Sequence, residues 1–415
     1  MFFVLKLKRK LLNGELATII SSLIKKIHLN LFFRDIVYFN KLVALHEYQE
    51  AYTYSQNKSL LKHNKNPELV RKIALSAYYS GNKEEATKIF EDRLFLFHKI
   101  NKKQLLLTSE EFLPKDIVFV TKYVYLGGYA NSGFLLHKSE GLSLASKIIK
   151  KTKLENKEVF FYTKIFLKYA FFSSFTPIFF SIHNNKKKNF IILTAEHILG
   201  ERPNNSKIQT ILKINRYIES IDYKEALSLL NPIGLDKGKA KARNLHKKST
   251  NVEIFSEIKN RLEKSNNFKL EALVSILKSI ILENHLYKLI NPDIHYSFCH
   301  NDFHKNNIIS QTENICKVFD WNSYSVALRG WDMCYYFGNF EFKFSEIEEI
   351  FINKINHCSN KDLVIAKIFY IYIQIYIWVL RLRNKSSFEK MNDYFVPAIK
   401  SIEVLHLELN KAVAR

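Results

Sequence analysis

The spacing of apolar residues along the chain changes from a helical period to a strand period. Residues 35–100 place apolar positions three and four apart, which is typical of helices that bury one face. From 115 to 200 the apolar residues gather in short β-branched runs separated by turns, with one helical segment, Lys157 to Tyr169, among them. The runs that predict strands are Ile117–Val120, Phe134–Leu136, Ser146–Ile149, Ile178–Phe180 and Phe190–Leu193.

From residue 201 to Arg415 the pattern is mainly helical. Its most apolar window, Ile368 to Leu380, is thirteen residues long, which is too short for a bilayer span and suits a buried helix. A polar, lysine-rich stretch at 231–250 predicts a surface loop. Short apolar runs within 297–322 interrupt the helical pattern and predict a strand–turn–strand hairpin.

The helical region contains a weak internal sequence repeat. Ala51 and Ala86 lie about thirty-five residues apart, near the period of a helix–turn–helix repeat. The second copy places Ala74, Ala86 and Phe90 around Gly81, a residue suited to a left-handed turn. This resembles a pair of tetratricopeptide units, and an unrelated helical hairpin is the alternative. Such a pair leaves an apolar face to cover, so we expect it to pack on the rest of the chain.

One set of polar residues lies in the predicted hairpin. The stretch from Cys299 to Asn307 contains His300 and Asp302, and Asp320 follows Asn307 by thirteen residues. Phosphoryl transfer needs a carboxylate for the acceptor hydroxyl, and an amide and a second carboxylate for Mg²⁺. A hairpin would bring Asn307 and Asp320 to the same end of a sheet, close enough to share metal ions. The sequence therefore predicts a kinase.

A glycine-rich segment lies between two of the predicted strands. Its residues Gly127, Gly128, Asn131 and Gly133 predict a turn whose backbone N–H groups approach phosphate oxygens. An ordinary β-turn would also explain the glycines, but their position upstream of a lysine and a glutamate favours the phosphate-binding interpretation.

Lys147 and Glu158 are the candidates for a lysine that contacts the phosphates and the carboxylate that orients it. Lys147 has the Ala-x-Lys form of a strand lysine, and Glu158 opens the predicted helix. Lys150 and Glu155 are the alternative pair. The predicted strand at 190–193 leads into a hinge whose backbone would bind an adenine ring; its residues are Thr194, Ala195, Glu196 and His197.

The order of these motifs resembles the aminoglycoside phosphotransferase and choline kinase family, over roughly residues 115–340. The resemblance implies an α+β fold with the two lobes of a protein kinase: a small β-rich lobe at 115–200 and a helical lobe at 201–415. A helical, tetratricopeptide-like region at 1–105 would precede them and is a candidate for binding a protein partner.

The resemblance also implies roles for the polar residues. Asp302 would be the catalytic base, Asn307 and Asp320 would bind Mg²⁺, His300 would support the catalytic loop, and Lys305 would contact the γ-phosphate of ATP. The Gly330–Asp332 segment would contribute a structural acid below the loop. Two positions depart from the family pattern: Asn322 stands where an acid is frequent, and Ala130 where a hydroxyl residue is common.

Aromatic residues behind Asp320 suggest an acceptor, since aromatic faces can surround a quaternary ammonium. They are Trp321, Tyr324, Trp331, Tyr335 and Tyr336, and packing is the alternative role for each. The leading expectation is an ATP- and Mg²⁺-dependent kinase of an amino alcohol such as choline or ethanolamine. The alternatives are a kinase of a sugar or glycan hydroxyl in cell-surface polysaccharide metabolism, and an inactive nucleotide-binding relic with a protein-binding helical region.

Composition and charge narrow the partners and the compartment. The 415 residues are 47% hydrophobic and 25% charged, which argues against wholesale disorder. The net charge is +23, but the basic residues are dispersed, so we expect no nucleic-acid partner. Residues 15–33 could form a basic amphipathic helix on a membrane, and a core-packing helix is favoured over it. The four cysteines lack metal spacing, which predicts reduced thiols and a cytoplasmic protein.

Overall fold

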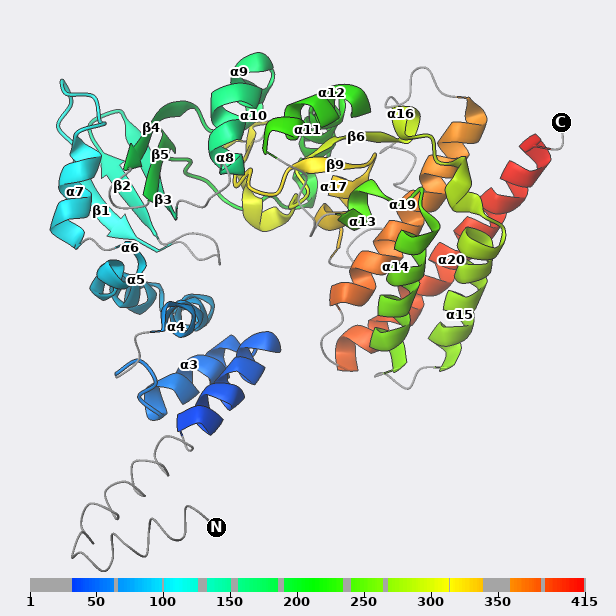
Figure 1. Ribbon diagram of the computed structural model, residues 1–415, viewed down its shortest axis with the longest axis horizontal. Coiled ribbons are helices and arrows are strands. Elements are labelled where there is room, and N and C mark those ends of the chain that lie inside the picture. Colours follow the sequence, from blue (N-terminus) through cyan, green and yellow to red (C-terminus); the bar gives the residue numbers. More distant parts are fainter. Residues whose placement is uncertain are drawn as a thin grey trace, which may run out of the picture. The chain divides into compact units, whose positions relative to one another are not determined.

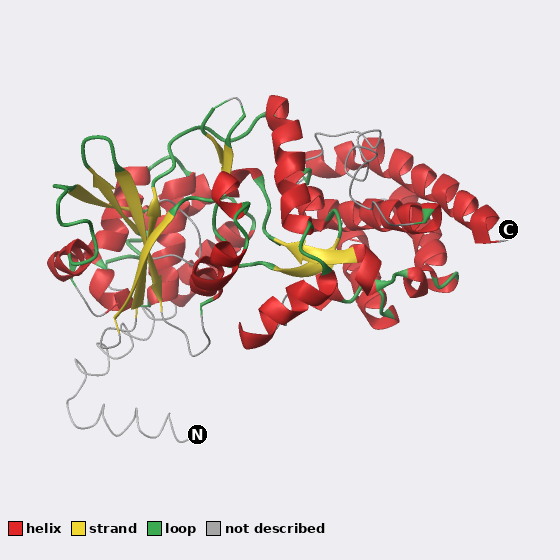
Figure 2. Ribbon diagram, turned by 90° about the horizontal axis from the view of Figure 1, so that it is seen from above, coloured by secondary structure: helices red, strands yellow, loops and turns green. Residues whose placement is uncertain are grey.

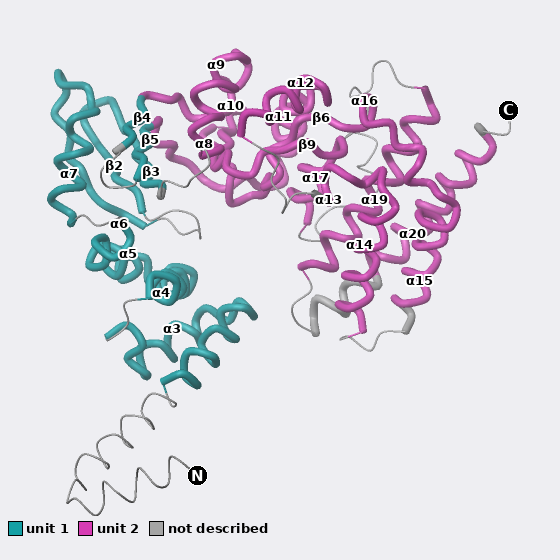
Figure 3. Tube along the Cα trace, in the orientation of Figure 1, with its two compact units in different colours: residues 1–151, 181–194 teal, residues 152–180, 195–415 magenta. Residues whose placement is uncertain are grey.

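The computed structural model has two compact units (Figures 1 and 3). One unit contains residues 1–151 and 181–194, and the other contains residues 152–180 and 195–415. The residues that the structure describes are 32–62, 66–98, 101–125, 133–150, 156–185, 190–233, 240–263, 268–312, 314–338, 359–381 and 385–413. The helix after residue 156 thus belongs to the second unit, whereas the sequence pattern groups it with the strands. The three predicted domains stay a prediction.

The first unit contains most of a five-stranded sheet with the order β1-β2-β3-β5-β4. The β1–β2 and β2–β3 pairs are antiparallel, and Phe134 lies opposite Lys147. Four of the five predicted strands overlap β2, β3, β4 and β5, whereas the predicted run Ile117–Val120 shares only Val120 with β1. Val118 is 90% exposed and contributes no buried face to the sheet. The strands are β1 Val120–Val124, β2 Phe134–Lys138, β3 Ser143–Lys150, β4 Phe179–Asn185 and β5 Phe190–Glu196.

Helices precede the sheet in the first unit. The helical hairpin expected around Gly81 is present: α4 ends at Tyr79, Gly81 adopts a φ of 92°, and α5 begins at Lys83. Ala74, Ala86 and Phe90 are fully buried in it, so the hairpin is confirmed, while its tetratricopeptide identity stays a prediction. The helices are α3 Tyr48–Asn57, α4 Pro67–Tyr79, α5 Lys83–Asp92, α6 Leu94–His98 and α7 Lys102–Glu110, and residues 32–44 are also helical.

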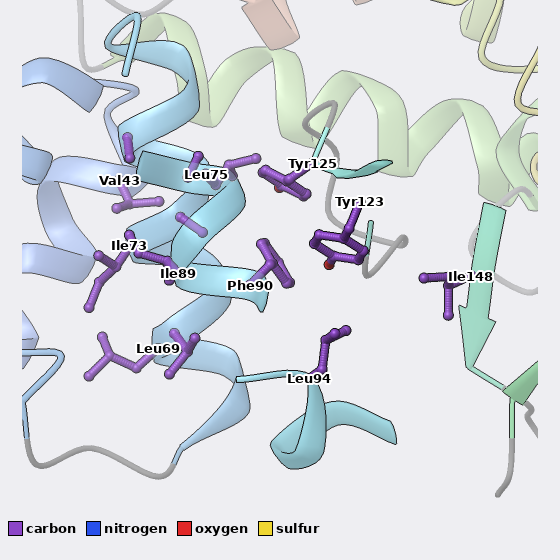
Figure 4. Close-up of a cluster of buried hydrophobic side chains, with 14 of the residues drawn as sticks. Val43, Leu69, Ile73, Leu75, Ile89, Phe90, Leu94, Tyr123, Tyr125 and Ile148 are labelled. Carbon is purple, nitrogen blue, oxygen red and sulfur yellow. The ribbon is translucent and has the colours of Figure 1, made fainter. Parts of the chain in front are cut away.

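These helices and the sheet share one hydrophobic core (Figure 4). Ile73 and Ile89 lie in the same buried cluster as Tyr123, Leu135 and Ile148 of the strands. Side chains of this size each contribute roughly 1.5–3 kcal/mol when they are buried. The expectation that the helical pair packs on another part of the chain is therefore confirmed: its apolar face packs against the sheet.

The second unit is mainly helical and carries two short pairs of strands (Figure 2). Its strands are β6 Tyr296–Cys299, β7 Ile308–Ser310, β8 Cys316–Val318 and β9 Ser325–Leu328, paired as β6–β9 and β7–β8. Its longer helices are α11 Ile208–Glu219, α12 Tyr223–Leu230, α14 Lys248–Leu262, α15 Phe268–Lys278, α19 Asn360–Arg381 and α20 Lys385–Val413. Its shorter helices are α8 Lys157–Phe160, α9 Phe166–Lys168, α10 Phe172–Phe175, α13 Ala240–Arg243, α16 Pro292–His295 and α17 Trp331–Tyr336. Two π-helical segments, η1 Phe161–Ile165 and η6 Ser279–Glu283, and four 3₁₀ turns, η2 Asn205–Lys207, η3 Asn231–Ile233, η7 Leu286–Leu289 and η8 Lys305–Asn307, complete the elements described here.

Part of the predicted surface loop at 231–250 is wrong. Residues 240–243 form α13, and α14 begins at Lys248. Ala242 and Leu245 are buried, and the Lys241 ammonium forms ion pairs with Glu253 and Glu257 of α14. Lys241 is thus compatible with a helix that packs on the unit, because its charge is paired while its aliphatic stem can pack.

The apolar helix α19 is long and hydrophobic enough to cross a membrane, with a mean hydropathy of 2.0 in its best window. However, 83% of that window is buried inside the protein, as expected for the core helix predicted at Ile368–Leu380. Cys299, Cys316 and Cys334 are buried and unpaired with one another, and Cys358 lies outside the described residues.

Candidate active site

The loop after β6 is fixed by the buried carboxylate of Asp332, in the first turn of α17. Its two oxygens accept hydrogen bonds from the backbone N–H groups of His300 and Asn301, each 2.7 Å long. Asn301 adopts a left-handed φ of 62°, and its side-chain oxygen accepts a hydrogen bond from the Trp331 indole at 2.8 Å. The segment at 330–332 therefore holds the loop in a backbone conformation that would otherwise cost free energy.

His300 is buried and neutral. Burial lowers the pKa of its imidazole to about 4, although Asp302 and Asp320 act in the opposite direction. The ring bridges two backbone groups: Nδ1 accepts from the N–H of Asp302 at 3.3 Å, and Nε2 donates to the carbonyl of Phe319 at 3.1 Å. This pairing requires the Nε2–H tautomer. His300 connects the loop to the strand that precedes Asp320, which is a structural role.

Asp302 lies beside Asn307, as the sequence predicts. The Asn307 amide donates to the Asp302 backbone carbonyl at 2.9 Å and to its carboxylate Oδ2 at 3.1 Å. The other carboxylate oxygen, Oδ1, is 3.5 Å from Nε2 of His304. The Asp302 side chain is 36% exposed, so it is oriented by two neighbours and still accessible to a reactant.

Asp320 reaches the same edge of the β7–β8 hairpin as Asn307. Ile308 pairs with Val318, and the ladder continues through a 3.0 Å hydrogen bond from the N–H of Phe319 to the carbonyl of Asn307. Asp320 then turns with a φ of 63°, and its Oδ1 accepts a 3.0 Å hydrogen bond from the Asn322 amide. The predicted strand–turn–strand geometry is confirmed.

The donor set at this edge fits Mg²⁺. Carboxylate and amide oxygens are hard ligands, and Mg²⁺ is commonly bound through one or two protein groups together with substrate phosphates and water. Among the described residues there is no cluster of three or more His, Cys, Asp or Glu side chains that could hold a metal without such help. Asn307 and Asp320 would therefore hold the ion together with a nucleotide.

The hairpin is anchored to the rest of its unit by Lys317. This lysine is only 8% exposed, and its ammonium donates to the carbonyls of Ser173 and Thr176 at 3.1 and 3.2 Å. Burial lowers its pKa. Trp321, next to Asp320, stacks on Phe161 with ring centroids 4.2 Å apart and an interplanar angle of 4°. These contacts fix β8 on one side of Asp320 and Trp321 on the other.

Two of the predicted phosphate-binding residues, Gly133 before β2 and Lys147 of β3, lie close together in the first unit. Gly127, Gly128 and Asn131 lie outside the described residues. Gly133 adopts a φ of 109° and packs against the ring of Tyr123, so a side chain could not replace it without a shift. Its carbonyl accepts a 3.2 Å hydrogen bond from Ile148, which brings Lys147 of β3 next to this end of the glycine-rich segment.

The predicted helix glutamate and hinge lie mainly in the second unit. Glu158 is buried in the first turn of α8, and its backbone N–H is capped by Asn156. Glu196 ends β5: its backbone N–H donates to the carbonyl of Ile178 at 2.8 Å, and its carboxylate accepts from the Ile178 N–H at 3.2 Å. The Glu196 N–H is thus engaged within the protein.

Thr194, the first residue of the predicted hinge, belongs to a buried polar chain in the sheet. Its hydroxyl lies 2.7 Å from that of Ser146, which lies 2.9 Å from Nε2 of His137. Nδ1 of His137 is 2.9 Å from the hydroxyl of Thr121. Burial lowers the pKa of His137 to about 4, so the ring is neutral. These hydrogen-bonded side chains link strands β1, β2, β3 and β5, so the Thr194 hydroxyl has its partner within the sheet.

The aromatic residues behind Asp320 are mostly packing residues. Trp321, Tyr324, Trp331 and Tyr336 are at most 4% exposed, so they offer no open face for a quaternary ammonium. The fifth, Tyr335, is half-buried, and the guanidinium of Arg381 lies over its ring at 5.9 Å. Packing, the alternative role given for these residues, holds for the four buried ones.

Arg381 is a residue near the site that the sequence motifs do not identify. It donates to the Tyr335 carbonyl at 3.1 Å, and its guanidinium packs against Gly338. Burial raises the pKa of Tyr335 to about 12 and lowers that of His304, and on both groups the charges of Asp302 and Arg381 act in opposite directions. Arg381 lies at the end of α19, far from the motifs in sequence, so the sequence pattern does not identify it as a neighbour of Tyr335.

Comparisons with solved structures return enzymes of the kind that the motifs resemble. Spectinomycin phosphotransferase is 17% identical over 73% of this chain and 94% of that chain, with a TM-score of 0.43. A choline kinase from Streptococcus pneumoniae is 16% identical over 72% of this chain and 99% of that chain, with a TM-score of 0.41. An aminoglycoside 2'-phosphotransferase is 10% identical over 75% of this chain and 99% of that chain, with a TM-score of 0.46. No family model and no curated protein matches the sequence.

Proposed function

We propose that this protein is an ATP- and Mg²⁺-dependent phosphotransferase that acts on a hydroxyl group of a small molecule. One observation carries the proposal: Asn307 and Asp320 meet at one edge of the β7–β8 hairpin, and Asn307 also orients the carboxylate of Asp302. This combination supplies a base and two metal ligands within one short segment, and these are the functional groups that phosphoryl transfer requires.

The proposed reaction uses the residues as follows. Asp302 accepts a hydrogen bond from the acceptor hydroxyl, orients its oxygen toward the γ-phosphorus of ATP, and takes its proton as the new P–O bond forms and the bond to ADP breaks. When bound, Mg²⁺ neutralises charge on the phosphates. Asn307 and Asp320 keep their oxygen atoms in place for that ion, while Asp332 and His300 prevent the loop from shifting. Lys305 is a candidate contact of the γ-phosphate.

Nucleotide-binding roles are proposed for the residues that the sequence motifs identify. Gly127, Gly128, Asn131 and Gly133 are proposed to bind phosphates through the backbone, and Lys147 through its ammonium, with Glu158 as the carboxylate that orients it. The adenine ring is proposed to bind the backbone of the hinge at residues 194–197. Each of these roles is a prediction that the nucleotide-binding measurements below can test.

Two classes of acceptor remain proposals. The amino alcohols choline and ethanolamine are the first, and the hydroxyl of a sugar or glycan is the second. The second is favoured by Arg381, because a fixed cation over Tyr335 opposes the approach of a quaternary ammonium to the one half-buried ring of the set. The four other aromatic residues are buried and do not compensate for it.

The test is ADP formation from ATP by the full chain with a panel of amino alcohols, sugars and small glycans. The proposal expects acceptor-stimulated turnover that disappears with EDTA and returns with Mg²⁺. Tight binding of ATP without turnover on any acceptor would favour the alternative of an inactive nucleotide-binding protein. Failure to bind ATP at all would overturn both.

A further inference from the structure

His304, two residues after the proposed base, contacts the carboxylate of Asp302 from within the same loop. Its Nε2 lies 3.5 Å from Oδ1 of Asp302. The Asn307 amide approaches the other oxygen, Oδ2, at 3.1 Å. Each oxygen of the carboxylate therefore has its own neighbour, and only one of these neighbours, Asn307, is also a proposed metal ligand.

The other ring nitrogen of His304 fixes the tautomer of the imidazole. Nδ1 accepts the backbone N–H of Asn306 at 3.1 Å, and this bond caps the 3₁₀ turn η8. A ring nitrogen that accepts a hydrogen bond carries no proton, so the proton of the neutral ring is on Nε2 and faces Asp302. The ring is thus suited to orienting the carboxylate, and both of its nitrogens are engaged in doing so.

Hydrogen bonds of the turn hold the ring in this place. The His304 N–H donates to the Asp302 carbonyl at 3.1 Å, and the His304 carbonyl accepts from the Asn307 N–H at 2.8 Å. The side-chain oxygen of Asn306 accepts a hydrogen bond from the guanidinium of Arg202, about a hundred positions earlier in the same unit. The imidazole therefore reaches Asp302 from a turn that is fixed on both sides.

The orientation of the Asp302 carboxylate matters because a general base must point a lone pair at the hydroxyl that it deprotonates. The terminal torsion of an aspartate is broad, so the carboxylate turns easily unless its oxygens have partners. The Asp302 side chain is 36% exposed, and packing alone does not prevent this rotation. A displacement of about 1 Å at a reacting group can reduce a rate on the order of a hundredfold.

We propose that His304 is a positioning residue for Asp302, which holds the carboxylate in the orientation that receives the proton of the acceptor hydroxyl. This inference deepens the proposed function and rests on it, because it assumes that Asp302 is the base. It also distinguishes two supports of the base. Asn307 orients Asp302 and is a ligand of the proposed metal ion, whereas His304 orients Asp302 without contact to that ion.

Two substitutions in the full chain separate the functions of the two ring nitrogens. His304→Asn keeps an acceptor for the Asn306 N–H but is too short to reach Asp302, whereas His304→Gln keeps an N–H donor at a reach similar to that of Nε2. With the best acceptor of the wild type, the inference expects kcat to fall about tenfold to a hundredfold in His304→Asn. In His304→Gln, kcat should stay within about threefold of the wild type.

A second set of measurements tells orientation of the base from substrate binding. The KM for the acceptor, the dissociation constant of ATP·Mg²⁺ and the Mg²⁺ concentration at half-maximal turnover should each change by less than about threefold in both variants, since the lost contact acts on the transition state. His406→Asn is the matched control, because it makes the same substitution on α20, which carries none of the proposed site residues. Circular dichroism and thermal unfolding show whether each variant is folded.

The outcomes distinguish this inference from the proposed function. Unchanged kcat in His304→Asn, or an equal loss of kcat in His304→Asn and His304→Gln, overturns the inference alone. A loss that appears in the acceptor KM or in ATP·Mg²⁺ binding, with kcat preserved, also overturns it alone. A wild-type protein that transfers no phosphoryl group to any acceptor overturns the proposed function and this inference together.

Discussion

The carboxylate of Asp332 accepts the backbone N–H of Asn301 at 2.7 Å, and through this bond α17 fixes the loop that carries Asp302. The second carboxylate oxygen binds the N–H of His300 at the same distance. Both N–H groups belong to buried residues, so without the carboxylate they would lose a partner that water cannot replace.

Replacement of Asp332 by alanine should therefore damage stability and activity together. Two buried N–H groups left without partners cost roughly 1–3 kcal/mol each, so we expect the free energy of unfolding to fall by about 2–5 kcal/mol. Turnover should fall at least about a hundredfold, since the loop loses its left-handed geometry at Asn301. Urea unfolding and a turnover assay check this. The unfolding free energy of Asp332→Asn, which keeps one acceptor, should lie between those of the wild type and the alanine variant. An alanine variant with wild-type stability would contradict the role assigned to Asp332.

The neutral histidines predict a loss of stability in acid. Burial lowers the pKa values of His137 and His300 to about 4, below the value of about 6.5 for an unfolded chain. The unfolded state therefore gains protons first, and the stabilising contribution, complete above about pH 6.5, is lost as the pH falls toward 4. Between pH 7 and 4.5 each histidine should account for roughly 2–3 kcal/mol of the loss.

His137→Gln isolates this effect away from the catalytic loop. Its unfolding free energy should decrease less than that of the wild type over the same pH range, by about 2 kcal/mol. Urea unfolding at pH 7, 5.5 and 4.5 gives both curves. Parallel curves for the two proteins would show that His137 titrates in the folded state as it does in the unfolded chain.

Lys317 should support the metal edge of the hairpin through its two carbonyl partners. Lys317→Met keeps the apolar stem and removes both hydrogen bonds, so we expect a loss of about 1–3 kcal/mol in unfolding free energy. Because β8 leads directly to Asp320, the Mg²⁺ concentration at half-maximal turnover should rise. The exposed Lys213→Met serves as the control. An unchanged Mg²⁺ requirement would limit Lys317 to stability.

Arg381 should influence the choice of acceptor. Arg381→Met removes a cation that lies 5.9 Å from the centre of the Tyr335 ring, and at this range the electrostatic effect amounts to roughly 1 kcal/mol. We therefore expect kcat/KM for choline, relative to that for a neutral sugar, to rise about three- to tenfold. Competition assays with both acceptors measure the ratio. A ratio that does not move would indicate that Arg381 only fastens α17 to α19 through the Tyr335 carbonyl.

The parts of the fold that the sequence predicts are those set by local pattern. Four strands of the sheet (β2 to β5), the turn at Gly81 and the β7–β8 hairpin follow from apolar periodicity and turn residues close to one another in the chain. The proximity of Asn307 and Asp320 then follows from hairpin geometry.

Other features depend on contacts that leave no local signal. The partners of Lys317 are backbone carbonyls, and Thr87 binds a residue 38 positions away, so neither residue type nor spacing reveals them. The predicted loop at 231–250 is partly helical because Lys241 is paired across to α14, which a count of lysines cannot show. The aromatic cage for an ammonium was plausible from composition, and burial of four of its members removes it.

The most direct test of the account is phosphoryl transfer by the Asp302→Asn variant under saturating ATP and Mg²⁺, with ATP binding measured in parallel. Asparagine keeps the shape and the contact with Asn307 but cannot take a proton. The account predicts that turnover falls by a factor on the order of 10² or more while the dissociation constant of ATP·Mg²⁺ changes by less than about threefold. Turnover at the wild-type rate would contradict the proposed role of Asp302.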